Sequence, residues 1–427
     1  MPEKDAAAPE GAQATPEGDA AAKAATEAGK AAEEAAAAAA PPPKQMKCVV
    51  LTGFGGIKMI KVQQKPEPKL AEGEVLIRAK ACGMSFPDLM LRQGVIDNVP
   101  KPPLVMGFEC AGLVEALGEN TTGFNVGDRV IALSDYKAWA ELVAVPATSV
   151  YKLPENVSWE DGACLLMNYV TAYILLFDLA NLRKGQSILL HSAGGGVGQA
   201  ILQLCSTVED VTVFGTASAH KHESIKDRVT HLLDHNVDYV QEIRKVSSDG
   251  VDIVLDCLCG EDTNRGISVL KPMGKYLLYG SSNIVTGETK SFFSFAKSLH
   301  MPDNIVWWQV DKVNPIKLFD DNKSVGGFQL RRLMFRQGQH AYVRAVVDKI
   351  MDMYRHGKIR PVIDSIWAFE DVGEGMQKLH DRKNIGKILL DPSKEPAPKP
   401  EKSAEKEQAE GGENGGTEKS EPAVNGE

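Results

Sequence analysis

Four glycines crowd one short stretch of this chain, QSILLHSAGGGVG at 186–198: they are Gly194, Gly195, Gly196 and Gly198, with Val197 between the last two. An apolar run at 188–190 predicts a buried strand before them, and AILQLC at 200–205 predicts a helix after them. Glycine lets the backbone approach a pyrophosphate, and the free amides of the first helical turn face its charge. A glycine-rich turn occurs in other α/β proteins, but a second predicted strand at 211–215 favours a dinucleotide site.

The end of that second strand predicts which dinucleotide is bound. An NAD site usually has Asp or Glu there, which binds the ribose hydroxyls. This chain instead has Ser218 and Lys221, and no acid occurs before Glu223. A hydroxyl and a cation suit the additional 2′-phosphate of NADPH. The alternative is that Ser218 and Lys221 are ordinary residues at the start of a helix.

The cysteines show no metal or disulfide pattern. There are seven, at positions 48, 82, 110, 164, 205, 257 and 259. The number is odd and no CxxC occurs, which favours free thiols in a reducing, cytoplasmic compartment. Cys257 and Cys259 alternate along a predicted strand end, so we expect their side chains to point apart.

Two patterns of elements must position these residues. Strand-like segments with glycine turns between them follow one another from 46 to 146, and no helical crossover fits there, which predicts a partly closed β-domain. Ser158 and Asp161 then form a capping box, and strands alternate with helices up to 281, as in a doubly wound parallel sheet. Four closing elements are expected: a last strand of that sheet at 325–330, a helix at 342–354, a helix region at 367–381 and a strand at 385–390. We expect the last three to return to the β-domain.

Composition sets the domain limits. The predicted units are an Ala/Glu/Pro-rich disordered tail at 1–45 with a fraying helix at 20–40, a β-domain at 46–165 and 326–392, a dinucleotide domain at 166–325, and an acidic disordered tail at 393–427. The net charge of −9 lies mostly in the two tails, at −4 each, so composition gives no case for nucleic-acid binding or a basic membrane face. No secretory signal is evident. The apolar stretch 165–180 is interrupted by Asn168 and Asp178 and predicts a buried helix rather than a membrane span.

Several motifs together resemble the medium-chain dehydrogenase/reductase superfamily over residues 46–391. They are ACG (81–83), GFECAG (107–112), GDRV (127–130), AGGGVG (193–198), LDCLCG (255–260), YGSSN (279–283) and IGKILL (385–390). Within it, the chain is similar to the zinc-free quinone-reductase branch and, more narrowly, to the homolog-like members of the vesicle amine transport protein group. The resemblance implies an α/β fold with a GroES-like, partly closed β-barrel domain plus a doubly wound parallel-sheet Rossmann domain. It also implies a homodimer formed by edge pairing of the two cofactor sheets.

The resemblance also bears on zinc. Zinc-dependent members carry Cys and then His just after the strand that corresponds to 73–83, and a further His in the segment that corresponds to 107–109. Those positions are Ser85, Phe86 and Phe108 here. A hydroxyl and two phenyl rings cannot supply the thiolate and imidazole ligands of a catalytic zinc. We therefore expect no bound metal.

Several further site residues are implied by the resemblance. Ser85, where the family usually has Asn, and Asp88 are the candidate catalytic residues; Ser85 can still donate a hydrogen bond, and Asp88 fits equally well as a helix N-terminal carboxylate. His235 stands where Tyr often lies beside the adenine-side phosphate, and an exposed surface histidine is the alternative. The residues implied beside the nicotinamide half are Asn168, Thr171, Cys257, Gly280, Ser281, Ser282 and Asn283.

Two functions remain open on this evidence. The first is zinc-independent, NADPH-dependent hydride transfer to a quinone-like or enone acceptor, which delocalises the arriving charge onto its own oxygen. The second is an NADPH-binding regulator with little turnover that acts through partners at vesicle or mitochondrial surfaces, by peripheral association only. The stretch 299–306 has no family counterpart and predicts no function.

Overall fold

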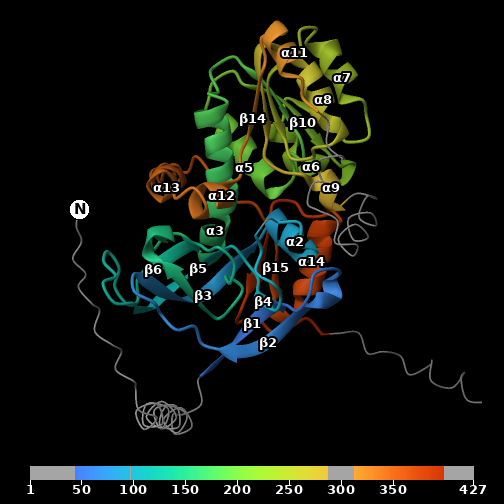
Figure 1. Ribbon diagram of the computed structural model, residues 1–427. Coiled ribbons are helices and arrows are strands. Elements are labelled where there is room, and N and C mark those ends of the chain that lie inside the picture. The colour runs from blue at the N-terminus through green and yellow to red at the C-terminus, as the bar shows by residue number, and fades with distance from the viewer. Residues whose placement is uncertain (1–43, 97, 287–311, 399–427) are drawn as a thin grey trace, which may run out of the picture.

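The computed structural model describes residues 44–96, 98–286 and 312–398, which form two domains stacked end to end (Figure 1). The predicted helix at 20–40, the stretch 299–306 and nearly all of both predicted tails lie outside the described residues. The β-domain occupies the lower half of Figure 1 and the doubly wound domain the upper half.

The β-domain is built mainly from antiparallel strands, and only β15 and β16 pair in parallel among its described strands. A three-stranded sheet has the order β2-β1-β4, and a larger sheet has the path β15-β16-β3-β5-β6-β8 with β7 added on β3. The long strand β3 (Glu74–Met84) is central because it pairs with β5, β7 and β16. The remaining bounds are β1 Gln45–Leu51, β2 Ile60–Pro66, β4 Leu104–Val105, β5 Glu109–Leu117, β6 Arg129–Leu133, β7 Leu142–Pro146 and β8 Val150–Lys152.

The C-terminal elements return to this domain, as expected. β16 (Lys387–Asp391) pairs antiparallel with the end of β3. The helix region expected at 367–381 was wrong in its first part, because Trp367 belongs to strand β15 (Ile363–Ala368), which pairs with β16. Only the later residues form helix α14 (Val372–His380). The ladder partner β16 thus decides the conformation at Trp367, which local composition did not reveal.

The upper domain contains the predicted parallel sheet. Its strand order is β11-β10-β9-β12-β13-β14, which corresponds to the 3-2-1-4-5-6 order of dinucleotide-binding sheets. The strands are β9 Ser187–Leu190, β10 Thr212–Ala217, β11 His231–Asp234, β12 Val251–Asp256, β13 Leu270–Leu278 and β14 Ser324–Gly327. β14 is the last strand of the sheet, as predicted, but it spans Ser324–Gly327 and Leu330 already belongs to a helix, so the strand predicted at 325–330 was wrong in its last part.

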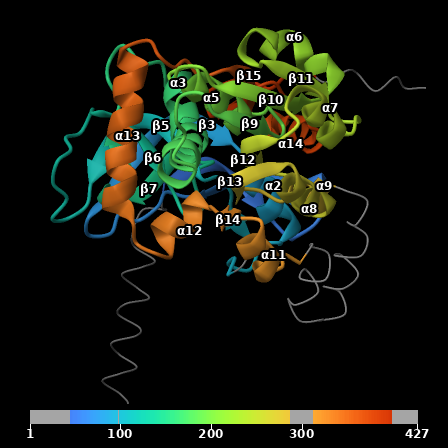
Figure 2. The ribbon, with the colours of Figure 1, turned by 90° about the horizontal axis from the view of Figure 1, so that it is seen from above.

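Helices cover both faces of this sheet, seen from above in Figure 2. α13 is amphipathic and buries Val343, Val346 and Ile350 on the inner face predicted for 342–354. The helices not yet given are α2 Phe86–Gln93, α3 Trp159–Cys164, α4 Thr171–Tyr173, α5 Gly196–Cys205, α6 His222–Ile225, α7 Tyr239–Val246, α8 Glu261–Ser268, α9 Ser282–Thr286, α11 Pro315–Asp320, α12 Leu330–Phe335 and α13 His340–Arg355.

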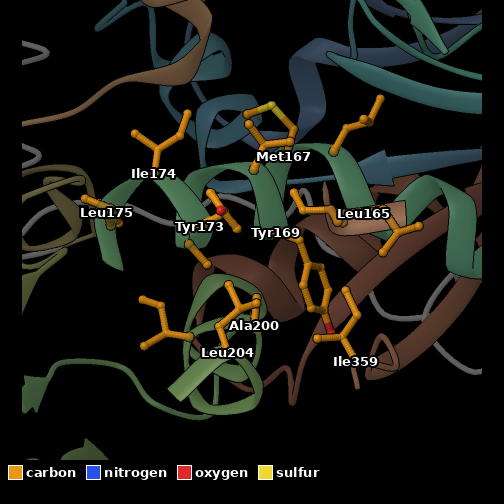
Figure 3. Packing of buried hydrophobic residues seen from close by; sticks show 14 of the residues in the cluster. Leu165, Met167, Tyr169, Tyr173, Ile174, Leu175, Ala200, Leu204 and Ile359 are labelled. Atoms are coloured by element: carbon orange, nitrogen blue, oxygen red, sulfur yellow. The ribbon is translucent and has the colours of Figure 1, made fainter. Parts of the chain in front are cut away.

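One apolar helix runs through the centre of the molecule. Within the described residues, only Trp159–Leu179 is long and apolar enough to cross a membrane, with 21 residues and a mean hydropathy of 1.5. It is longer than the sequence suggested, but 83% of its apolar window is buried inside the protein. Figure 3 shows Tyr169 reaching from it toward Ile359, with Ala200 and Leu204 of α5 on the same side. The apolar side chains of this helix are therefore packed within the protein core.

Candidate functional site

A cavity of about 750 Å³ lies between the two domains at the carboxyl ends of β9, β12 and β13. This is the switch point of the sheet, where β9 has β10 on one side and β12 on the other. The predicted residues that line the cavity are Ser85, Asn168, Thr171, Gly195, Gly196, Val197, Gly198, Lys221, Cys257, Gly280, Ser281 and Ser282. Five predicted residues do not line it: Asp88, Gly194, Ser218, His235 and Asn283.

The glycine turn has the close geometry that a pyrophosphate site needs. A Cβ atom at Gly198 would clash with the carbonyl oxygens of Ser192 and, at 2.6 Å, of Ala193. A Cβ atom at Gly196 would lie 2.6 Å from the side-chain amide of Asn168. α5 begins at Gly196, so the N–H groups of its first turn lack intrahelical acceptors. Glycine is therefore required for packing at 198, while the N–H groups of residues 196–198, which line the cavity, have no intrahelical acceptor.

Asn168 and Thr171 reach this turn from the central helix. Both side chains are buried. Asn168 lies where the backbone widens into a π-helical turn at Leu165–Val170, and Thr171 begins α4 directly after this turn. π-turns often occur at functional sites because they redirect side chains. Here the distortion places the Asn168 amide over Gly196, which fits its predicted place beside the cofactor.

Lys221 lies against the glycine turn, but its ammonium is already engaged. Its stem crosses Gly194, whose Cβ would meet Lys221 Cδ at 2.8 Å, and its Nζ donates to the Asn384 carbonyl at 2.7 Å. Burial lowers the pKa of Lys221 to about 8, with Asp364 opposing and Arg382 reinforcing the shift. Ser218 and His235 do not line the cavity, and His235 is exposed, with its Nδ1 3.5 Å from Asp234 Oδ1. Their contacts with the phosphates of the cofactor stay predictions.

Asp88 does not face the cavity. It is fully buried at the N-terminus of α2, and its Oδ2 accepts the backbone N–H of Ser85 at 2.8 Å. Burial raises its pKa to about 8, partly offset by the Ser85 hydrogen bond and by Lys387. The helix N-terminal carboxylate, one of the two interpretations of Asp88, describes what the structure shows. Ser85, by contrast, lines the cavity wall.

A buried ion pair beside Ser85, whose lysine also lines the cavity, was missed in the sequence. Lys387, at the start of β16, and Glu109, at the start of β5, are 3% and 1% exposed, and Lys387 Nζ donates to Glu109 Oε1. Lys387 Nζ also donates to Ser85 Oγ at 2.5 Å. Glu109 lies in the motif GFECAG and Lys387 in the motif IGKILL, two of the motifs that carry the family resemblance. A lysine inside a buried strand was the signal that could have identified the pair.

Two arginines also line the cavity without having been predicted. Arg331 of α12 is buried, and its Nε donates to Asp135 Oδ1 at 2.6 Å. Arg382 donates to Asn283 Oδ1 at 3.2 Å. Asn283 therefore contacts a residue that lines the cavity but does not line the cavity itself. Both come from segments remote in sequence from the glycine turn, so no spacing pattern linked them to it.

The residues at the expected zinc positions do not fit zinc. Phe108 is buried, and its ring centroid lies 5.4 Å from that of Tyr136, with the Arg331 guanidinium 4.6 Å from the Tyr136 ring. Arg331 lines the same cavity as Ser85 and Phe86. In the described part of the chain, no group of three or more His, Cys, Asp or Glu side chains is placed to hold a metal ion. No step of the chemistry is therefore assigned to zinc.

None of the seven cysteines, all of which lie within the described residues, forms a disulfide. Cys257 is the one that lines the cavity. Burial raises the pKa of the Cys257 thiol to about 11, so it stays protonated near neutral pH. Cys257 therefore forms part of the wall and does not act as a thiolate nucleophile.

Comparison with known proteins matches two family models: residues 71–155 match the alcohol dehydrogenase GroES-like domain, and residues 229–390 match the zinc-binding dehydrogenase model. The chain is 59% identical to the mouse (Mus musculus) synaptic vesicle membrane protein VAT-1 homolog-like over 83% of each chain. It is 32% identical to a quinone oxidoreductase of Pongo abelii over 81% of this chain and 98% of that protein.

Solved structures agree with this relationship. The crystal structure of the human VAT-1 homolog-like protein matches with a TM-score of 0.72 and 51% identity, over 82% of this chain and 99% of that one. A mycobacterial protein solved in complex with NADPH matches with a TM-score of 0.70 and 26% identity, over 81% and 100%.

Proposed function

Because the chain belongs to the medium-chain dehydrogenase/reductase superfamily, in its VAT-1 homolog-like group, we propose that it is a zinc-independent NADPH-dependent oxidoreductase acting on quinone-like or enone acceptors. The observation that carries the proposal is the cavity itself. A glycine turn at the sheet's switch point and a polar cluster around Ser85 line one space. The names of two relatives, a quinone oxidoreductase and a protein complexed with NADPH, support it.

The cavity residues fit NADPH. The first turn of α5, residues 196–198, offers backbone donors for the pyrophosphate, and Lys221 and Arg382 supply cations that line the same cavity. Asn168, Thr171 and the 280–282 segment line the same cavity as Ser85 and the glycine turn. When bound, NADPH would supply a hydride to an electrophilic carbon of the acceptor, whose displaced electron pair moves onto its oxygen.

The protein then has two tasks, to hold the acceptor and to stabilise that oxygen. Apolar side chains, among them Phe86, Met90, Ile96 and Leu333, line the cavity and suit the ring or chain of an acceptor. Ser85 offers a hydroxyl to the oxygen on which charge develops. Water supplies the final proton to the hydroquinone or enol anion, so no protein metal is required.

A panel assay tests this proposal. NADPH oxidation by the full chain is followed at saturating NADPH with 9,10-phenanthrenequinone, 1,4-naphthoquinone and an alkyl enone, and Ser85→Ala serves as the comparison. We expect turnover with at least one acceptor and about a tenfold or larger loss in Ser85→Ala. NADPH binding without turnover on any acceptor would favour the alternative, a cofactor-binding regulator.

The homodimer stays a proposal and rests on the sheet edge. β14 pairs with β13 on one side, and within the described residues its other edge has no partner strand. Exposed apolar side chains surround that edge, namely Met273, Ile316, Phe319 and Val325. An unpaired apolar edge is normally covered, and a second copy of the same sheet would cover it.

Localisation also stays a proposal. The mouse and human relatives are named synaptic vesicle membrane proteins. In this chain the single membrane-length helix of the described residues is buried in the core. We therefore propose a cytoplasmic protein whose association with vesicle or mitochondrial surfaces, where it occurs, is peripheral.

A further inference from the structure

The hydrogen-bond direction at Ser85 is fixed by its partner. Lys387 Nζ lies 2.5 Å from Ser85 Oγ, and an ammonium donates but cannot accept. Ser85 Oγ must therefore accept this bond. Its own proton has two remaining directions, toward Glu109 Oε1 over a long 3.3 Å contact, or into the cavity that Ser85 lines.

Glu109 holds Lys387 in this position. One of its oxygens takes the Lys387 ammonium, and the other accepts the backbone N–H of Met167 at 2.9 Å. Gly83 leaves room for this carboxylate, because a Cβ atom there would clash with it. Glu109 is also 1% exposed, so water does not compete for the ion pair. The pair is thus a rigid unit spanning β5 and β16.

We infer that Lys387, oriented by Glu109, is a positioning residue that keeps the Ser85 hydroxyl turned into the cavity and strengthens it as a hydrogen-bond donor to the acceptor oxygen. A hydroxyl that accepts a charge-assisted bond is polarised and donates more strongly. The effect grows as negative charge develops on the acceptor oxygen, which makes it selective for the transition state. This inference rests on the proposed function, since it specifies how that site meets its acceptor.

Ser85 therefore interacts with a ligand differently from an amide side chain at the same position. An amide side chain can turn either its oxygen or its nitrogen toward a ligand. Ser85 already accepts the bond from Lys387, so its own proton is the group that it presents to a ligand in the cavity. The site therefore selects acceptors with an oxygen that gains charge, such as quinones and enones.

The first test uses Lys387→Met, Glu109→Gln and the double variant that removes both charges. The single variants leave one buried charge without its partner and can lose stability, whereas the double variant avoids this problem. We expect kcat with 9,10-phenanthrenequinone to fall about tenfold or more in the double variant, while the Kd for NADPH changes less than about twofold. If the double variant regains wild-type kcat together with wild-type thermal stability, the pair is only structural and the inference is overturned.

The Ser85→Ala background separates positioning from a general effect. If Lys387 acts through Ser85, the double variant should reduce kcat little further once the hydroxyl is gone. A full additional loss in that background overturns the inference. Lys271→Met is the matched control: Lys271 Nζ also contacts a serine hydroxyl and a carboxylate, Ser187 Oγ at 3.1 Å and Asp252 Oδ2 at 2.8 Å, but lies away from this cavity.

A binding readout keeps the test independent of turnover. 4-Nitrophenolate, whose oxygen already carries the charge, is titrated into the NADP⁺-loaded protein and followed by its absorbance. We expect binding that weakens about tenfold in both Ser85→Ala and the double variant. Equal affinity in all three proteins, or no binding to the wild type, overturns the inference. Phenolate binding that depends on Lys387, in a protein without turnover on any acceptor, would reject the proposed activity but keep the positioning role.

Discussion

The ammonium of Lys221 and the main-chain carbonyl of Asn384 are joined by a hydrogen bond of 2.7 Å. Lys221 belongs to the parallel-sheet domain, whereas Asn384 lies in the segment that leads into β16 of the β-domain. Two residues further on, the N–H of Gly386 donates to the carbonyl of Gly194 at 2.9 Å. The glycine turn is therefore held by both domains. Lys221, which we expect to bind the 2′-phosphate, is part of the same contact between the domains.

Lys221→Ala should weaken NADPH binding by about tenfold or more and change NADH binding much less. The reason is that a charge-assisted hydrogen bond to the 2′-phosphate is worth about 1.5–3 kcal/mol, and NADH lacks that phosphate. Intrinsic-fluorescence titration with both cofactors measures the difference. Lys226→Ala is the control, because Lys226 forms an exposed ion pair with Glu223 nearby in sequence. An equal loss for both cofactors would mean that Lys221 acts only through the 384–386 segment.

The preference for NADPH over NADH should decline as the pH rises above about 8. Burial lowers the pKa of Lys221 to about 8, so the free protein loses this positive charge in that range, although bound phosphate will shift the loss upward. NADH binding should show no matching decline. Titrations at pH 7, 8 and 9 measure the ratio, and a constant ratio would contradict the assignment.

The same lowered pKa of Lys221 should raise the stability of the folded protein as the pH increases, whereas the preference for NADPH should decline. Between about 8 and the ordinary value of 10.5, the unfolded chain holds a proton on Lys221 that the folded chain has lost. The unfolded state binds more protons there, so the contribution of Lys221 to the free energy of unfolding increases with pH across this window. Comparing wild type and Lys221→Met by denaturant unfolding at pH 7.5 and 10 isolates this contribution. It should favour the wild type more at pH 10.

Substitutions at two glycines of the turn, Gly195 and Gly198, should affect the protein in different ways. Gly195→Val should abolish binding of both cofactors with little loss of stability, because the nearest atom to a Cβ there is the Ser192 carbonyl oxygen at 3.3 Å and the added side chain enters the cavity. Gly198→Ala should reduce thermal stability as well, because its Cβ would clash with backbone carbonyls that cannot move aside. Thermal melts and cofactor titrations distinguish the two. Equal melting temperatures for both variants would contradict this reading.

Protein purified without added metal should contain no stoichiometric zinc. Ser85, Phe86 and Phe108 supply no thiolate or imidazole, and the Phe108 ring packs against Tyr136. Elemental analysis by mass spectrometry provides the measurement, and chelator treatment should leave quinone turnover unchanged. One zinc per chain would refute the prediction.

The edge of the parallel sheet should mediate a homodimer. Phe319 is 81% exposed beside β14, and Val325 lies within that strand. Phe319→Asp combined with Val325→Lys places charge on this edge and should produce monomers at micromolar concentration. Sedimentation velocity compares the variant with the wild type. Lys349→Glu, on the remote helix α13, serves as a surface-charge control, and a wild-type monomer would remove the proposal.

The local chemistry of the glycine turn could be predicted from sequence because it depends on neighbours in the chain. The strand, the glycines and the helix that begins at Gly196 lie within one short stretch of the chain, and their spacing alone predicts a phosphate-binding turn. The alternation of strands and helices likewise predicted the parallel sheet and its last strand near β14, since hydrophobic periodicity records which face of each element is buried. The absence of zinc ligands at Ser85, Phe86 and Phe108 needed only residue types.

Tertiary structure alone decided which side chains meet across the domains. Lys387 contacts Ser85 and Glu109, residues about 300 and 280 positions away, because β16 pairs with β3 and β3 pairs with β5. Strand pairing over such separations leaves no local pattern, so neither the ion pair nor the Lys221–Asn384 junction was visible in sequence. Asp88 shows the converse: its residue type suited catalysis, but burial at the start of α2 turned it toward the Ser85 backbone. Residue type limits what chemistry a position can perform, and the packing of distant strands determines which positions share a site.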